Sequence, residues 1–128
     1  MLKPLDKFSG NAYALLRLVT GFMFCFHGIQ KIFGILSPMQ PPVGSLMWFG
    51  GMIELIGGAL VLIGFQTRLA AFICSGEMAV AYFMFHYKFQ GGAEIFPAIN
   101  KGEPAALYSF VFLLIACKGA GKWGLDKS

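Results

Sequence analysis

Three ionisable side chains lie inside strongly apolar stretches of this sequence. Arg17 is in the first such stretch, Glu54 in the second and Glu77 in the third. A charged group inside a bilayer costs at least about 2.5 kcal/mol on insertion scales, so it usually faces other helices or a water-filled cavity and marks a candidate functional site. Because an uncompensated charge is unfavourable there, we expect Arg17 to pair with Glu54 or Glu77 in the protein interior.

Arg17, Glu54 and Glu77 form a predicted intramembrane charge network, and its charges do not balance by themselves. It holds two carboxylates and one arginine, and an arginine keeps its proton. Both carboxylates are ionised cheaply only if His27 is also cationic; otherwise one of them stays protonated. Either arrangement places a labile proton in a low-dielectric interior, where it could couple to a redox or transport event. A purely structural ion pair is the alternative.

A candidate ligand site lies toward one end of the first stretch. His27 and Lys31 are four residues apart, so they share one face of a helix. Gly57 and Gly58, in the second stretch, either let helices pack closely or line a backbone-walled cavity for a flat ligand. We predict that His27, Lys31, Glu54, Gly57 and Gly58 form a ligand-binding site.

A third polar cluster is expected near the outer ends of the later stretches. It comprises Tyr82, His86 and Glu103, with interfacial anchoring and helix capping as the alternative role. His86 follows Glu77 by nine residues, which on a regular α-helix places the two on opposite sides. The sequence contains no HExxH motif, phosphate-binding loop or Ser/His/Asp signature. Because the two histidines are expected at different depths, we predict no metal or haem site.

Membrane-spanning helices must position these residues. The sequence is 57% hydrophobic and 12% charged, against roughly 25% charged residues in a soluble domain. Its 128 residues suffice for one unit. Apolar segments at about 11–33, 45–65, 69–87 and 104–117 predict an all-α fold, an integral membrane four-helix bundle that forms a single domain over residues 1–128.

The basic residues predict how this bundle is oriented. An even number of spans puts both termini on one side of the membrane. Most of the lysines and arginines fall on that side: Lys3, Lys7, Arg68, Lys118, Lys122 and Lys127. The other side has Lys88 and Lys101, so the positive-inside rule predicts cytoplasmic termini. Orientation thus explains the net charge of +4, and without a basic run interleaved with aromatics we expect no nucleic-acid partner.

The order and spacing of these motifs resemble those of the DoxX family of small membrane proteins. The matching residues are Arg17, His27-Gly28, Lys31, Glu54, Gly57-Gly58, Gly64, Thr67-Arg68, Glu77-Met78, His86 and Leu125-Asp126. Gly119-Ala120-Gly121 departs from the Gly-Pro-Gly that relatives often carry. The resemblance implies a four-helix protein of the bacterial plasma (inner) membrane that is linked with redox metabolism. Some relatives are named as subunits of a thiosulfate:quinone oxidoreductase.

Three functions fit these expectations. The first is a quinone-interacting subunit of a membrane oxidoreductase, in which His27 and Lys31 bond a quinone carbonyl and Glu54 or Glu77 relays protons. The second is a scaffold that anchors a soluble oxidoreductase. The third is a small-solute or proton-coupled carrier, which would need to form a homo-oligomer. With no cysteine pair, flavin motif or metal site, we do not expect the chain to catalyse redox chemistry alone.

Overall fold

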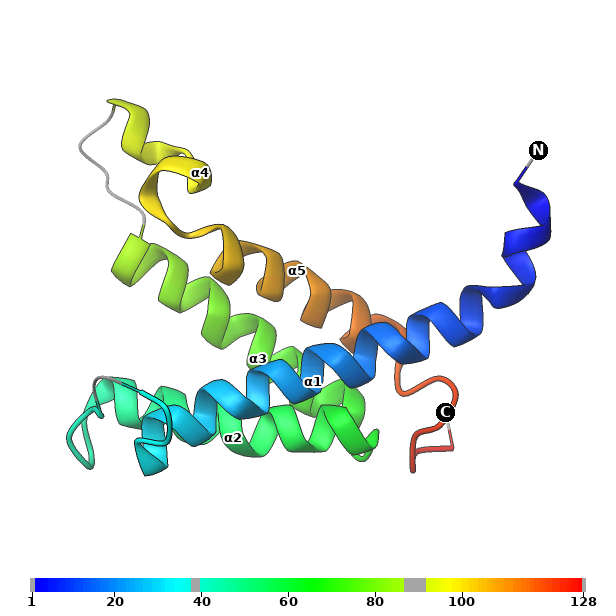
Figure 1. Cartoon of the computed structure of the whole chain (residues 1–128), viewed down its shortest axis with the longest axis horizontal. Helices are drawn as coiled ribbons and strands as arrows, with labels where there is room; N and C mark the ends of the chain where they lie inside the picture. The colour runs from blue at the N-terminus through cyan, green and yellow to red at the C-terminus, as the bar shows by residue number, and fades with distance from the viewer. Residues whose placement is uncertain (1, 38–39, 87–91, 128) are drawn as a thin grey trace.

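The computed structural model describes residues 2–37, 40–86 and 92–127, and these residues form helices without any strand (Figure 1). Within this part of the chain three helical segments are long and apolar enough to cross a membrane: Lys3–Phe33, Leu46–Ile63 and Thr67–His86. The predicted all-α membrane bundle is therefore confirmed.

The helices run close to their predicted bounds. In chain order they are η1 (Lys3–Phe8, a 3₁₀-helix), α1 (Ser9–Phe33), α2 (Leu46–Ile63), α3 (Thr67–Ala81), η2 (Tyr82–His86, a π-helix), η3 (Gly92–Ile95), α4 (Pro97–Asn100) and α5 (Glu103–Lys118). The predicted end of the third span, at Tyr87, lies outside the described residues, as does Lys88. The fourth predicted span corresponds to α5, which has 16 residues.

Local sequence signals explain why the second predicted segment is trimmed at both ends. The Ser45 hydroxyl accepts a hydrogen bond from the Trp48 backbone N–H at 3.2 Å, so Ser45 caps α2 rather than joining it. Gly64 ends the helix with a left-handed φ of 71°, a conformation that glycine adopts at little cost. Pro104 stands in the first turn of α5, where its missing N–H is not needed.

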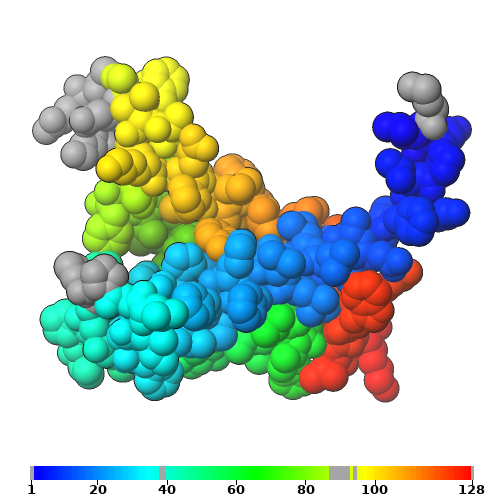
Figure 2. Space-filling view, viewed as in Figure 1, coloured from blue at the N-terminus to red at the C-terminus, as the bar shows by residue number. Residues whose placement is uncertain are grey.

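The long helices form two pairs. α1 packs against α2, and α3 packs against α5. The pairs meet near the end of the molecule where both chain termini lie, and they diverge toward the opposite end (Figure 1). The N-terminal segment, including η1, projects from this bundle and buries none of its residues (Figure 2). Both chain termini therefore lie at the same end of the molecule (Figure 1).

Glycines set the close approach of α1 to α2. A Cβ added at Gly21 would lie 2.5 Å from the backbone nitrogen of Leu62, and one added at Gly58 would collide with the backbone of Cys25. Gly57 plays the same part toward α3, because its added Cβ would lie 2.5 Å from Cys74 Sγ. These glycines therefore act as small residues in helix–helix contacts.

The C-terminal tail after α5 joins the two helix pairs at the termini end. Its backbone N–H groups at Leu125 and Asp126 donate to the carbonyls of Ile63 and Gly64 at 3.1 and 2.8 Å. The Asp126 carboxylate accepts hydrogen bonds from the backbone N–H groups of Gln66 at 3.0 Å and Thr67 at 2.8 Å, and so caps the first turn of α3. Thr67, through its side chain and its backbone N–H, and then Gln66 hold the pKa of Asp126 below its usual range.

Candidate functional site

Arg17 is fully buried and does not form the ion pair expected from the sequence. Its guanidinium instead donates hydrogen bonds to four backbone carbonyls: Val61 at 2.7 Å, Leu62 at 2.8 Å, Ala120 at 2.7 Å and Lys122 at 3.1 Å. The last carbonyls of a helix lack partners within the helix and carry the negative end of its dipole. The end of α2 and the tail therefore compensate this charge, and neither Glu54 nor Glu77 is needed for it.

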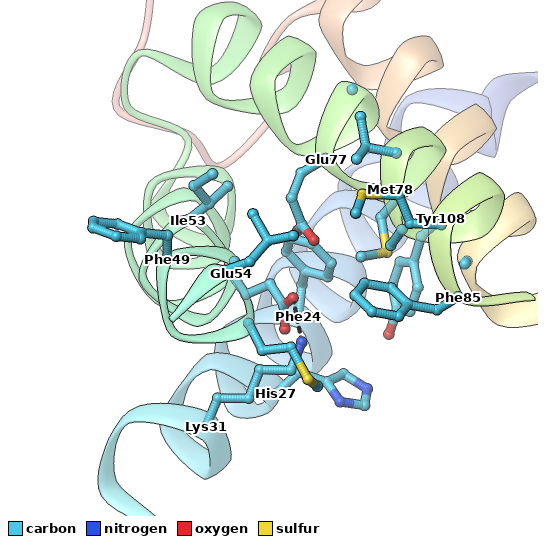
Figure 3. A pocket seen from close by; sticks show the side chains of 18 of the residues that line it. Phe24, His27, Lys31, Phe49, Ile53, Glu54, Glu77, Met78, Phe85 and Tyr108 are labelled. Atoms are coloured by element: carbon cyan, nitrogen blue, oxygen red, sulfur yellow. Dashed lines mark hydrogen bonds and ion pairs between the residues drawn. The ribbon is translucent and has the colours of Figure 1, made fainter. Parts of the chain in front are cut away.

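Lys31 takes the place that the sequence analysis assigned to Arg17. Its ammonium lies 2.7 Å from Glu54 Oε2, where it forms both a hydrogen bond and an ion pair (Figure 3). The Lys31 side chain is 28% exposed, whereas that of Glu54 is 2% exposed. Gly51 makes room for this contact, since an added Cβ there would lie 2.8 Å from the Cβ of Lys31. The pair thus joins the last turn of α1 to the middle of α2.

Glu77 approaches the same place from α3. A Cβ added at Gly50 would lie 3.6 Å from Glu77 Oε2 and 3.9 Å from Glu54 Oε2, so both carboxyl groups flank Gly50. The other oxygen of Glu77, Oε1, is buried without a hydrogen-bond partner among the described residues. Two carboxyl groups on neighbouring helices therefore lie close together, and the Lys31 ammonium contacts that of Glu54 (Figure 3).

A cavity of about 640 Å³ lies between the two helix pairs beside these groups. We call it the central cavity. Most of its wall is apolar, and its ionisable or polar side chains include His27, Lys31, Glu54, Glu77 and Tyr108 (Figure 3). His86 also lines the cavity. Its volume falls in the range of about 300–1,000 Å³ that is usual for small-molecule sites.

The structure places only part of the predicted ligand site on this wall. His27, Lys31 and Glu54 line the central cavity together. Gly57 and Gly58 do not, because they are occupied in the packing of α2 against α3 and α1. Two other glycines line the cavity instead, Gly50 of α2 and Gly76 of α3. A Cβ added at Gly76 would meet nothing within 4 Å, so the chain leaves open space there.

His27 is exposed in the isolated chain and stands at the edge of the cavity. Its ring lies 6.2 Å from that of Tyr108 in a T-shaped arrangement, which links α1 to α5. The Tyr108 ring also stacks near Phe112, with ring centroids 5.9 Å apart. Tyr108 was not identified from the sequence, because a tyrosine in an apolar helix gives no sign of which way it faces.

His86 lines the same cavity as Glu77, contrary to the expectation that they face opposite sides of one helix. The reason is the change from α-helix to π-helix over Tyr82–His86. A π-helix closes each turn with one more residue than an α-helix, which rotates His86 back toward the face of Glu77. The residue pattern does not predict this change to a π-helix. Single π turns of this kind occur frequently at functional sites.

The predicted outer cluster is divided in the structure. Asn100 Nδ2 donates to the Tyr82 hydroxyl at 3.2 Å, and His86 Nδ1 lies 3.3 Å from the Asn100 carbonyl oxygen. Asn100, which the sequence analysis did not single out, therefore connects these two aromatic residues. Glu103 is exposed in the first turn of α5, where a negative charge complements the helix dipole.

The fold and the cavity define a small helical membrane protein with a polar cluster between its helix pairs. Residues 12–87 match the family model for DoxX, and the chain belongs to that family. The resemblance noted in the sequence is therefore confirmed.

Three relatives show how this likeness extends along the chain. An uncharacterized protein of Haemophilus influenzae is 40% identical over 98% of this chain and 96% of its own length. The protein named "Putative oxidoreductase CatD" of Bacillus subtilis is 32% identical over 62% of this chain and 65% of its own length. The protein named "Inner membrane protein YqjF" of Escherichia coli is 27% identical over 87% of this chain and 86% of its own length. No solved structure matches this chain.

Proposed function

We propose that this protein is a membrane subunit that binds a quinone, or a similar flat lipid-soluble molecule, in the central cavity and supplies protons to it. The observation that carries the proposal is the carboxyl pair on an otherwise apolar wall. Glu54 is neutralised by Lys31 at 2.7 Å, whereas Glu77 has a buried oxygen without a partner among the described residues. An unpartnered buried polar atom beside an apolar cavity is expected to face a ligand or water.

Charge balance explains what such a pair can do. One lysine neutralises one of the two carboxylates, and the second is neutralised most simply by a proton. A proton on one of two neighbouring carboxyl groups can be shared with the other. A quinone takes up two protons and two electrons when it is reduced. In this proposal the carboxyl pair passes on the two protons one after the other and takes up a new proton from water after each transfer, and a separate oxidoreductase provides the two electrons.

The position of the cavity suits a ligand that arrives through the lipid. Several side chains on its wall, among them Leu46, Phe49, Ile73 and Val80, are also exposed on the surfaces of α2 and α3. A lipid-soluble molecule can therefore reach the cavity without crossing a polar layer. His27, His86 and Tyr108 stand on the wall as hydrogen-bond donors for its carbonyl oxygens.

The relatives support a redox setting in a bacterial membrane. One relative is named an oxidoreductase and another an inner membrane protein, and we extend both descriptions to this chain as part of the proposal. We also propose that both termini lie in the cytoplasm, because the basic residues concentrate at that end. A soluble redox partner and a homo-oligomer stay predictions from the sequence.

Filling the cavity tests the proposal directly. Gly76→Leu places a side chain in the open space on α3, while Ala12→Leu adds the same bulk at an exposed position on α1. We would measure quinone affinity for the purified proteins in lipid nanodiscs. We expect wild type and Ala12→Leu to bind equally and Gly76→Leu to bind at least tenfold more weakly. Equal affinity for all three would place the ligand elsewhere. If folded wild type binds no quinone, the scaffold function becomes the better explanation.

A further inference from the structure

A second cavity, of about 510 Å³, adjoins the central cavity on the side of the connection between α1 and α2. We call it the loop-side cavity. Most of its wall is apolar, as in the central cavity, but the polar residues Gln30, Ser37, Gln40 and Ser45 are among those that line it. Five residues line both cavities: His27, Lys31, Leu46, Met47 and Phe85. Lys31 and His27 therefore stand where the two cavities meet.

We propose that the loop-side cavity is the aqueous route by which water and protons reach Glu54 and Glu77, and that this route opens to one side of the membrane. The inference deepens the proposed function and rests on it for the use made of the protons. The route itself rests on the two cavities and on the contact of Lys31 with the buried Glu54 between them.

The two members of the ion pair on this route differ in burial. Lys31 is 28% exposed and touches the loop-side cavity, whereas Glu54, which it contacts at 2.7 Å, is 2% exposed. Glu77, which is half-buried, follows next to Glu54 beside Gly50. A proton that Glu77 gives to a ligand is replaced by one that passes from water through the Lys31 ammonium and the Glu54 carboxylate. Lys31 then regains a proton from water, so the charge of the cluster is restored.

The glutamines of the loop-side cavity leave room for water. Gln30 Nε2 donates to the Leu36 carbonyl at 3.0 Å, and Gln40 Nε2 donates to the Ile32 carbonyl at 2.6 Å. A glutamine amide has a second N–H and an acceptor oxygen, so each side chain holds the connection in place and still offers groups to water. A space of this size has room for water, which can bind to these polar groups.

The opposite end of the bundle is closed by tight packing. Arg17, Ala14, Val61 and Ala120 are all 0% exposed there, and the tail lies across the end of α2 through its hydrogen bonds to Ile63 and Gly64. The guanidinium of Arg17 is committed to four carbonyls. Access to the carboxyl pair is therefore expected from the loop side and not from the side of the termini.

Cysteine labelling in sealed vesicles tests this sidedness. The starting protein carries Cys25→Ala and Cys117→Ala and keeps Cys74, which is fully buried. Into it we would introduce Gly50→Cys, whose Cβ has space beside both carboxyl groups. Gly76→Cys serves as the second reporter if the first does not fold. The probe is a positively charged, membrane-impermeant methanethiosulfonate added to one side at a time.

Three further variants define the sides and the background. Leu36→Cys, at an exposed position, marks the loop side, and Lys127→Cys marks the side of the termini. Ala14→Cys, at a buried position in the closed end, should not react from either side. We expect the cavity reporter to react at least tenfold faster from the side that labels Leu36→Cys. Faster or equal reaction from the side that labels Lys127→Cys, or no reaction in a folded reporter, would overturn the route.

The same proteins separate this inference from the proposed function. Quinone affinity would be measured on the unlabelled reporters in nanodiscs. One-sided labelling without quinone binding would keep the aqueous route and reject the quinone ligand. Quinone binding with labelling from the termini side would keep the ligand and reject the route.

Discussion

Replacing Arg17 with methionine should strongly destabilise the protein, although neither Glu54 nor Glu77 pairs with this arginine. Methionine keeps much of the apolar stem and removes every donor. Two of the four hydrogen bonds, to the carbonyls of Val61 and Ala120, are completely buried. A hydrogen bond to a charged group contributes about 1.5–3 kcal/mol, so losing these two predicts a loss of about 3–6 kcal/mol. The bonds to Leu62 and Lys122 are partly buried, and water can replace them.

Arg68 provides a matched control for this effect. It also donates to the last carbonyls of a helix, those of Ala116, Cys117 and Lys118 in α5. These bonds are exposed, however, so Arg68→Met should lower the free energy of unfolding by no more than about 1 kcal/mol. The two arginines thus differ mainly in burial. Unfolding would be followed by circular dichroism during SDS titration of mixed micelles, and the free energies compared with wild type.

Two results would refute the reasoning. Equal losses for Arg17→Met and Arg68→Met would mean that burial of the carbonyl contacts does not set the magnitude. Rescue of Arg17→Met by Glu54→Gln would mean that the arginine has a carboxylate partner after all. Because the two sites share no hydrogen-bond partner, the losses should instead add within about 0.5 kcal/mol.

Three further changes test other parts of the structure. Lys31→Met should lose about 3–5 kcal/mol of unfolding free energy because it leaves the Glu54 carboxylate buried and unpaired, and the double variant with Glu54→Gln should recover most of that loss in the same SDS titration. Gly58→Ala should lose about 1–3 kcal/mol through overpacking, whereas Gly76→Ala, with open space around it, should melt at or above the wild-type temperature. The pKa of Asp126 is lowered in the folded protein. Its ionised carboxylate therefore contributes to stability above the ordinary pKa of about 4, and this contribution is lost as pH falls through the pKa of the folded protein. Asp126→Asn should remove that part of the acid dependence of the melting temperature.

Sequence alone determined the class of this protein. Hydropathy and charge content are sums over local residues, and they suffice to predict apolar helices that cross a membrane. Helix ends were predicted to within a few residues, because capping serines and left-handed glycines act locally, as at Ser45 and Gly64. The order of motifs also sufficed to identify the DoxX family, which the family match over residues 12–87 confirmed.

Only the tertiary structure decided which polar groups meet. Pairing by side-chain charge assigned Arg17 to a carboxylate, but backbone carbonyls at the end of α2 and in the tail compensate it. These groups are invisible in a residue pattern, because every residue has a carbonyl and only the fold leaves particular ones without partners. Lys31 then reaches Glu54, and a π turn brings His86 to the face of Glu77. Such contacts depend on the depth and rotation of neighbouring helices, which no single segment encodes.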